Sequence, residues 1–150
     1  DRRRGVSAMR QILIPVDPDE PARTRSAVAQ AIRIYQSEPV RLRLVNVQPR
    51  LSAHVAMYFG ADELQQLQQQ AGRDALAPAQ QMLDAAGIPY ASTVLTGRSA
   101  EIIADAARRF GCDRIVFGEP QGNLAGRVFG SLAEQVRQLL PTHWYQVLGS

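Results

Sequence analysis

The residues best suited to chemistry lie in a glycine-rich stretch at 118–131, directly after the apolar run Ile115-Val-Phe117. Its glycines recur every four residues, at Gly118, Gly122, Gly126 and Gly130, and Ser131 follows the last of them. Glycine lets backbone N–H groups approach a ligand closely, and a helix start adds unpaired donors and a positive dipole end. The stretch therefore predicts a site for an anion, most often a nucleotide phosphate.

This spacing of glycines also occurs where two helices pack, but each glycine opposes a helix by about 1 kcal/mol, so we predict a loop. The stretch contains no Gly-Lys-Ser/Thr and no Gly-x-Gly-x-x-Gly, so it is neither a Walker loop nor a dinucleotide fingerprint. Ser131 and Glu134 have the spacing of a capping box. That capping role is compatible with a phosphate contact from the amides of Gly130 and Ser131.

A cluster of carboxylates, Asp17, Asp19 and Glu20, follows the first apolar segment. A magnesium-binding phosphoacceptor site would also need an aspartate after the third strand and a later lysine. The third strand runs into Val94-Leu-Thr-Gly97 without an aspartate, and the chain has no lysine, so we exclude that site. Two interpretations of Asp17 stay open: its carboxylate accepts hydrogen bonds from a ribose or base, or it caps the first helix.

Other reactive residues give no catalytic constellation. His54 and His143 lack a cysteine or carboxylate at metal-ligand spacing, and no Gly-x-Ser-x-Gly elbow is present. Cys112 directly precedes Asp113 and an apolar strand, which is typical of a packed, unreactive thiol. We therefore expect no catalytic residue, no metal bound by the protein alone, and a binding module in preference to an enzyme.

Composition narrows the class of protein. The chain has 150 residues and 45% hydrophobic content, enough for one domain with its own core. The net charge of +3 falls to +1 without residues 1–8, which contain three arginines and one aspartate, so nucleic acid is not an expected partner. The apolar runs are too short to cross a bilayer, and a single cysteine agrees with a reducing, cytoplasmic location.

The elements that would position these residues alternate between strand and helix. Apolar runs predict strands at 11–16, 40–47, 90–96, 114–117 and 143–148, and helical spacing predicts helices at 23–35, 62–86, 99–110 and 132–140. We expect Pro78 to kink or split the second helix, Ser99 to cap the third, and Gly111 to end it. This order predicts one α/β domain at 10–148, a doubly wound five-stranded parallel sheet, preceded by a flexible leader at 1–9.

Ligands of such sheets bind beyond the carboxyl ends of the strands, where the strand order reverses. The loops after Val16 and Phe117 both lie at that edge. These features together resemble the universal stress protein family: the segment Ile12-Leu-Ile-Pro-Val-Asp17, Gly97 before the third helix, Asp113 to Gly118, and the pair Gly130-Ser131. The resemblance covers nearly all of 10–148.

The resemblance implies a small, cytoplasmic, usually dimeric α/β protein of a family in which some members bind ATP and others do not. Carried over to this sequence, it implies nucleotide contacts at Asp17, Val47, Gly118, Gly122, Gly130 and Ser131, with ATP or AMP and magnesium as the implied ligands. ATP-binding members carry Gly-x-x-Gly, nine residues, then Gly-Ser or Gly-Thr. Here the interval from the first glycine to the last is one residue shorter, and Pro120 stands where the second glycine belongs.

These changes weaken a phosphate site. A lost amide removes a charge-assisted hydrogen bond of about 1.5–3 kcal/mol, and a proline cannot donate. Glu119, if it points inward, repels a triphosphate by about 1 kcal/mol or more. Arg98 or Arg127 would offset this by pairing with phosphates. We expect a regulatory or stress-response module with an altered site that still accepts AMP or another small anion; the alternative is an ATP-binding member that hydrolyses slowly.

The last segment predicts how two copies meet. It is an apolar edge strand, which favours a homodimer with Trp144, Tyr145 and Val147 at the interface. Packing into the core is an equally good interpretation of the two aromatic residues. A third hypothesis is a dimerisation module whose protein partner binds the long connection at 48–60.

Overall fold

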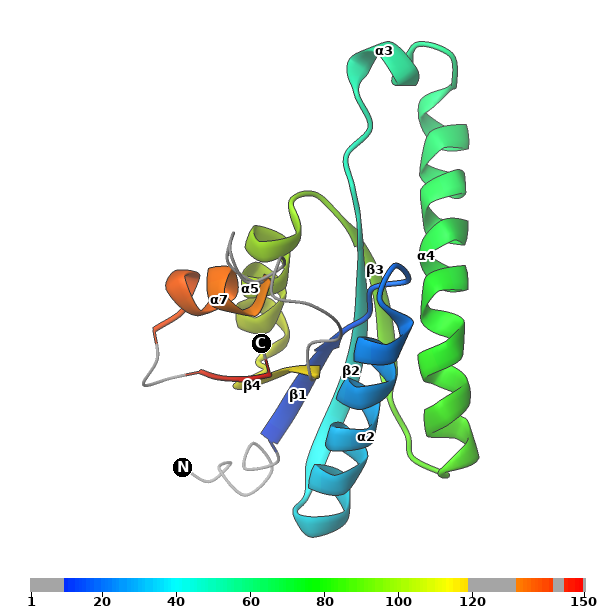
Figure 1. Ribbon diagram of the computed structural model, residues 1–150. Helices are drawn as coiled ribbons and strands as arrows, with labels where there is room; N and C mark the ends of the chain where they lie inside the picture. The colour runs from blue at the N-terminus through cyan, green and yellow to red at the C-terminus, as the bar shows by residue number, and fades with distance from the viewer. Residues whose placement is uncertain (1–9, 119–131, 142–144, 150) are drawn as a thin grey trace.

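Five parallel strands form the centre of the molecule, and helices cover both faces (Figure 1). The computed structural model describes residues 10–118, 132–141 and 145–149. The strands are β1 (Arg10–Pro15), β2 (Val40–Gln48), β3 (Ala91–Thr96), β4 (Arg114–Gly118) and β5 (Gln146–Gly149). The helices are α2 (Pro21–Ser37), α3 (Ala53–Ala56), α4 (Ala61–Ala85), α5 (Ser99–Phe110) and α7 (Leu132–Leu139).

The strands lie in the order β3-β2-β1-β4-β5, and every neighbouring pair is parallel. The register places Ile12 of β1 between Leu42 of β2 and Arg114 of β4. The order reverses at β1, because the chain moves outward through β2 and β3 and then returns to β4. The predicted doubly wound five-stranded sheet is thereby confirmed, and its reversal point lies between β1 and β4.

Two separate cores explain why the strands are apolar on both faces. Ile12 and Ile14 of β1 pack with buried residues of α2 and α4, whereas Leu13 between them packs with residues of α5 and α7. Successive side chains of a strand point to opposite faces, so a strand covered on both sides must be continuously apolar. This is the pattern from which the first strand was predicted.

The ends of α5 were only partly predicted. Gly111 ends the helix in the left-handed conformation, with φ of 69°, as expected. Ser99, however, is the first residue of the helix, and the N-cap position belongs to Arg98, whose side chain makes no capping hydrogen bond. The prediction of Ser99 as the cap was wrong because the extended backbone that precedes the helix ends one residue earlier.

Of the two outcomes expected at Pro78, a kink or a split of the helix, the split does not occur. Helix α4 is continuous from Ala61 to Ala85 with Pro78 inside it. Pro78 is exposed, while Ala75, Leu76 and Ala79 around it are buried against the sheet. A proline removes one backbone donor, and the packing of the buried residues of α4 holds the helix together in spite of that loss.

The connection at 48–60 contains the short helix α3. Its N-cap is Ser52, whose side-chain oxygen accepts the N–H of Val55 at 3.2 Å. Together with the start of α4, this segment extends beyond the end of the sheet (Figure 1). Met57 and Tyr58 are 80% and 73% exposed there.

Candidate functional site

A pocket of about 400 Å³ lies at the carboxyl ends of β1 and β2. It is lined by Pro15, Val16, Asp17, Pro18, Asp19, Val45, Asn46, Val47, Gln48, Pro49, Ser99, Ile103 and Leu132. The parallel strands end together at this edge, so the loop after β1, the end of β2 and the first turns of α5 and α7 converge there. Asp17 and Val47, which the family resemblance implies as nucleotide contacts, therefore line one pocket.

Asp17 lies just beyond the carboxyl end of β1. Its Oδ1 accepts the N–H of Asp19 at 2.9 Å, and its carbonyl accepts the N–H of Glu20 at 3.1 Å. The Thr24 hydroxyl bonds to the Asp17 backbone from inside α2. Glu20, not Asp17, occupies the N-cap of α2, so of the two interpretations of Asp17 the capping one was wrong.

Two amide side chains on β2 belong to the same pocket and were missed by the sequence analysis. Asn46 is buried, and its Nδ2 donates to the Val16 carbonyl at 2.9 Å. Gln48 donates from Nε2 to Asn46 Oδ1 at 2.7 Å. A signal was present, since Asn46 is the one polar residue in the run Leu44-Val-Asn-Val47. The pair ties the end of β1 to the end of β2 and adds polar groups to the pocket.

Gly118 ends β4 against α2. Its φ is 81°, and a Cβ at this position would collide with the Arg23 carbonyl oxygen and the Ala27 backbone nitrogen. Close packing between strand and helix therefore requires glycine here, independently of any ligand. The other predicted nucleotide contacts, Gly122, Gly130 and Ser131, lie outside the described residues, together with the expected capping box at Ser131.

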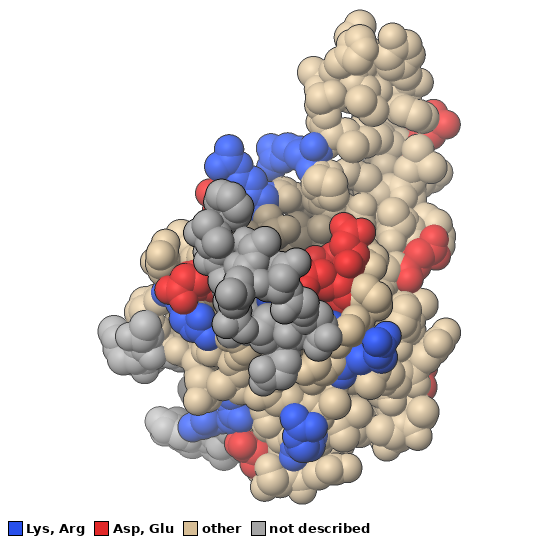
Figure 2. All heavy atoms as spheres, viewed as in Figure 1, with Lys and Arg blue, Asp and Glu red and all other residues tan. Residues whose placement is uncertain are grey.

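A second hollow, of about 720 Å³, adjoins the pocket and shares Pro49 and Ser99 with it. Arg50, Arg98 and Glu101 line this second hollow, whereas Asp17 and Asp19 line the first. Figure 2 shows the separation: basic side chains gather on one side of the hollowed centre of this face, and acidic side chains lie on another. The carboxyl edge of the sheet thus carries basic side chains on one side and acidic side chains on another.

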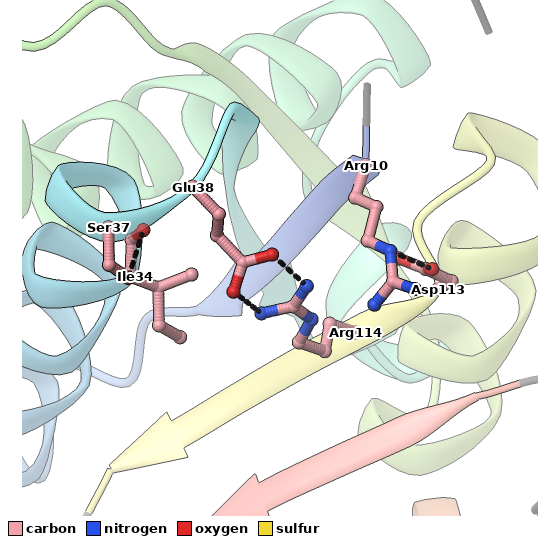
Figure 3. Close-up of polar contacts among 6 residues, drawn as sticks. All are labelled: Arg10, Ile34, Ser37, Glu38, Asp113 and Arg114. Carbon is pink, nitrogen blue, oxygen red and sulfur yellow. Dashed lines mark hydrogen bonds and ion pairs between the residues drawn. The ribbon is translucent and has the colours of Figure 1, made fainter. Parts of the chain in front are cut away.

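The opposite end of the sheet carries the most buried ion pair that the structure describes (Figure 3). Arg114 donates from Nη2 and Nη1 to the two carboxylate oxygens of Glu38, at 2.9 and 3.2 Å. These hydrogen bonds hold the pKa of Glu38 below its ordinary value of 4.5 and raise the pKa of Arg114. Arg10 and Asp113 lie beside this pair, 3.8 Å apart.

The described residues offer little other reactive chemistry. Cys112 is fully buried, and desolvation raises the pKa of its thiol to about 11, which confirms a packed, protonated cysteine. Among these residues, no three His, Cys, Asp or Glu side chains are placed to hold a metal ion. None of the described helices combines the length and apolarity that crossing a membrane requires.

Of the predicted dimer contacts, Val147 lies in β5, which is an edge strand of the sheet that the described residues form and pairs there only with β4. Tyr145 and Val147 are partly buried against the core on the α5 and α7 side, and Trp144 lies outside the described residues. Gln146 donates its N–H to Asp113 on the β4 side, so the Val147 carbonyl points to the free edge. Arg137 of α7 donates to that carbonyl at 3.3 Å and to the Gly149 carbonyl at 2.6 Å.

Comparisons with known proteins agree with this architecture. The model of the universal stress protein family matches residues 9–142. Among solved structures, a family protein from Burkholderia pseudomallei is 21% identical with a TM-score of 0.67, the alignment covering 96% of this chain and 97% of that one. UspA from Lactobacillus plantarum is 23% identical with a TM-score of 0.70, over 93% and 96% of the two chains.

A third similar structure is the universal stress protein from Archaeoglobus fulgidus in complex with dAMP. It is 16% identical, with a TM-score of 0.64 over 93% of this chain and 96% of that one. At these identities the solved structures establish a shared fold. No curated protein matches the chain.

Proposed function

This chain belongs to the universal stress protein family, and we propose that it is a homodimeric regulatory module that binds an adenine nucleotide with a short phosphate chain, in the cytoplasm. The nucleotide site in this proposal is the pocket at the carboxyl ends of β1 and β2. The observation that carries the proposal is that Asp17 and Val47, the two described residues that ATP-binding relatives imply as contacts away from the glycine loop, line one pocket there.

The pocket has the size and chemistry that a nucleoside needs. Its volume of about 400 Å³ lies in the range of small-molecule sites. Ile103 and Val45 give it apolar walls for a base, and the carboxylate of Asp17 is a hydrogen-bond acceptor for a ribose hydroxyl or a base amino group. The amide of Gln48, whose Nε2 donates to Asn46, adds a polar group to the lining.

The phosphate-binding side differs from that of ATP-binding relatives. The affinity for a triphosphate is lowered by the shortened loop together with Glu119 and Pro120. The loss of two charge-assisted hydrogen bonds lowers it by on the order of a hundredfold. A monophosphate requires fewer of those donors and carries less charge. The universal stress protein from Archaeoglobus fulgidus was solved in complex with dAMP, an adenine monophosphate, and this supports the proposal for this chain.

Thermal shift measurements with adenosine, AMP and ATP with magnesium test the proposal. We expect millimolar AMP to raise the melting temperature more than ATP does, because a ligand that binds only the folded state stabilises it. Asp17→Asn should reduce the AMP shift, and Asp62→Asn on the exposed start of α4 is the matched control. The absence of a shift with every adenine compound would contradict the proposal.

The second candidate is an ATP-binding protein that hydrolyses slowly. The same placement of Asp17 and Val47 in one pocket favours it, since that is the arrangement ATP-binding relatives imply. A larger thermal shift with ATP than with AMP, ATP recovered from the purified protein, and phosphate release that Asp17→Asn abolishes would together select this candidate.

For the homodimer, we propose contact through the last strand and the residues just before it. The free edge of β5 supports this placement, although Arg137 already occupies the carbonyls of Val147 and Gly149. Side chains at 144, 145 and 147 would therefore form the contact, with little pairing of backbones. The exposed Met57 and Tyr58 keep the connection at 48–60 as the second candidate for a protein contact.

A further inference from the structure

The two hollows at the carboxyl edge of the sheet form one continuous surface with opposite charges at its ends. The Gly97 N–H donates to the Gln48 carbonyl at 3.0 Å, which joins the residue before Arg98 to a residue two positions before Arg50. Gln68 of α4 donates to the Pro49 carbonyl at 2.8 Å and holds the same loop from the other side. Arg50 and Arg98 therefore belong to loops whose backbones are held by hydrogen bonds.

The positive charges of this hollow are available to a ligand. Arg98 Nη1 lies 3.9 Å from Glu101 Oε2, and these side chains are 86% and 63% exposed, so the pair contributes little. Arg50 is exposed, and no ion pair is described for it. The three groups sum to one positive charge beside a pocket whose own charged side chains, Asp17 and Asp19, are negative.

An anionic ligand in this site therefore has a preferred direction. Like charges repel at the Asp17 end, and opposite charges attract at the Arg98 end. The carboxylate of Asp17 is suited to a donor, such as the amino group of a base or a sugar hydroxyl. A guanidinium is suited to phosphate, because its forked donors match the phosphate oxygens.

We propose that the phosphate of the bound nucleotide lies between Arg50 and Arg98, over the loops that follow β2 and β3, and not over the glycine-rich stretch that follows β4. The base or sugar then points toward Asp17. This inference rests on the proposed function and names the anion subsite and the direction of the ligand. It explains how a chain with Glu119 and Pro120 in its glycine-rich stretch retains a phosphate contact.

The test is isothermal titration of the full chain with AMP and with adenosine. The variants are Arg50→Gln, Arg98→Gln and the double variant, with Arg33→Gln as control, since Arg33 is an exposed arginine on α2 away from the site. We expect each single variant to weaken AMP about tenfold and to leave adenosine unchanged, and Arg33→Gln to change neither. The loss should shrink at high salt, because exposed charges are screened.

Glu101→Gln should change the AMP affinity in the opposite direction. A misfolded variant would not bind AMP more tightly, so this variant also controls for misfolding. Removing this carboxylate frees Arg98 and takes a negative charge from the hollow, so AMP should bind a few-fold more tightly while adenosine is unchanged. If the AMP affinity of the double variant and of Glu101→Gln equals that of the wild type, the inference about the phosphate subsite is wrong. The proposed function would still stand in that case, provided that the wild type binds adenosine and AMP.

Failure of the proposed function is a separate outcome. If the wild type binds neither adenosine nor AMP, the nucleotide assignment is wrong, and inorganic pyrophosphate becomes the probe of the subsite. Pyrophosphate binding that the double variant weakens would support the anion subsite. Pyrophosphate binding that is absent, or equal in the wild type and the double variant, would overturn it.

Discussion

Arg114 carries a positive charge into the amino-terminal end of the sheet, where its side chain is only 6% exposed. Glu38 accepts from both terminal nitrogens, and Nε has no hydrogen-bond partner in the described part of the chain. Glu38 itself is 41% exposed, but removing its carboxylate leaves the buried guanidinium of Arg114 uncompensated, which costs more than the loss of a fully exposed pair. Single side chains therefore matter most where the protein excludes water.

We predict that Glu38→Gln removes part of the acid sensitivity of the fold. The pKa of Glu38 is lowered on folding, so its contribution to the free energy of unfolding is complete above its ordinary value of 4.5 and is lost as pH falls through the folded value. Urea midpoints at pH 7, 5, 4 and 3 should show wild type above the variant at neutral pH and the two converging in acid. Curves that stay parallel would contradict this, and Glu63→Gln on exposed α4 is the control.

Gly118→Ala should destabilise the protein through both strain and collision. A positive φ costs a residue with a Cβ about 1–2 kcal/mol, and the new methyl would also meet the backbone of α2. Gly87→Ala should cost only the backbone strain, because Gly87 has a φ of 71° and no atom lies near its would-be Cβ. Gly60→Ala should cost neither strain nor collision, because its φ is −71° and its surroundings are open. Unfolding free energies should therefore fall in the order Gly60→Ala, Gly87→Ala, Gly118→Ala. Equal losses at 87 and 118 would mean that α2 moves aside.

At the scale of elements, α4 shows tertiary packing prevailing over local preference. One face buries Ala75, Leu76, Ala79 and Leu83 against the sheet, while the other face is rich in glutamine. Pro78 lies on the exposed side and removes one hydrogen bond from the ladder. Burial of several apolar side chains contributes more than that loss, and the helix continues.

Pro78→Ala should consequently stabilise the protein by about 1–2 kcal/mol. Alanine restores a backbone donor and has the higher helix propensity by about 3 kcal/mol, and the greater freedom of the unfolded chain offsets part of the gain. Thermal and urea unfolding would measure the change. Gln66→Ala, at another exposed position of α4, should shift stability by a few tenths of a kcal/mol. A neutral or destabilising Pro78→Ala would show that the proline has a packing role.

At the scale of the whole molecule, β3 and β5 are the edge strands of the sheet, and no further strand pairs with either within residues 10–118, 132–141 and 145–149. Exposed edges favour pairing with another chain unless something covers them. On β5, Arg137 of α7 holds the outward carbonyl of Val147, which leaves side chains as the means of contact. The proposed dimer and the proposed nucleotide site therefore involve different parts of the molecule and can be tested separately.

We expect Val147→Lys to convert the proposed dimer to a monomer, because lysine on an edge strand opposes association. Ser92→Lys adds the same charge to the exposed side of the other edge strand, β3, and should leave the dimer intact. Light scattering after gel filtration gives the mass, and thermal unfolding establishes that both variants fold. A wild-type mass for Val147→Lys, or a monomer for Ser92→Lys, would contradict the placement of the interface.

The sequence by itself determined the architecture and indicated the edge of the sheet at which the candidate pocket lies. Continuous apolar runs and helical spacing are local patterns, and their alternation leaves a parallel, doubly covered sheet as the simplest arrangement. The carboxylate cluster after the first strand indicated Asp17, and the family resemblance added Val47. Local signals were less reliable at Ser99 and Pro78, where the neighbouring backbone and the packing of the helix decide the outcome.

Only the tertiary structure decided which distant polar groups meet. Glu38 and Arg114 are 76 positions apart, and strand order brings them together. Asn46 bonds to the end of β1 because of the register between two strands, and Arg50 and Arg98 line one hollow because β2 and β3 are neighbours. Such pairings depend on long-range contacts, whereas periodicity reports only whether a residue is inside or outside its own element.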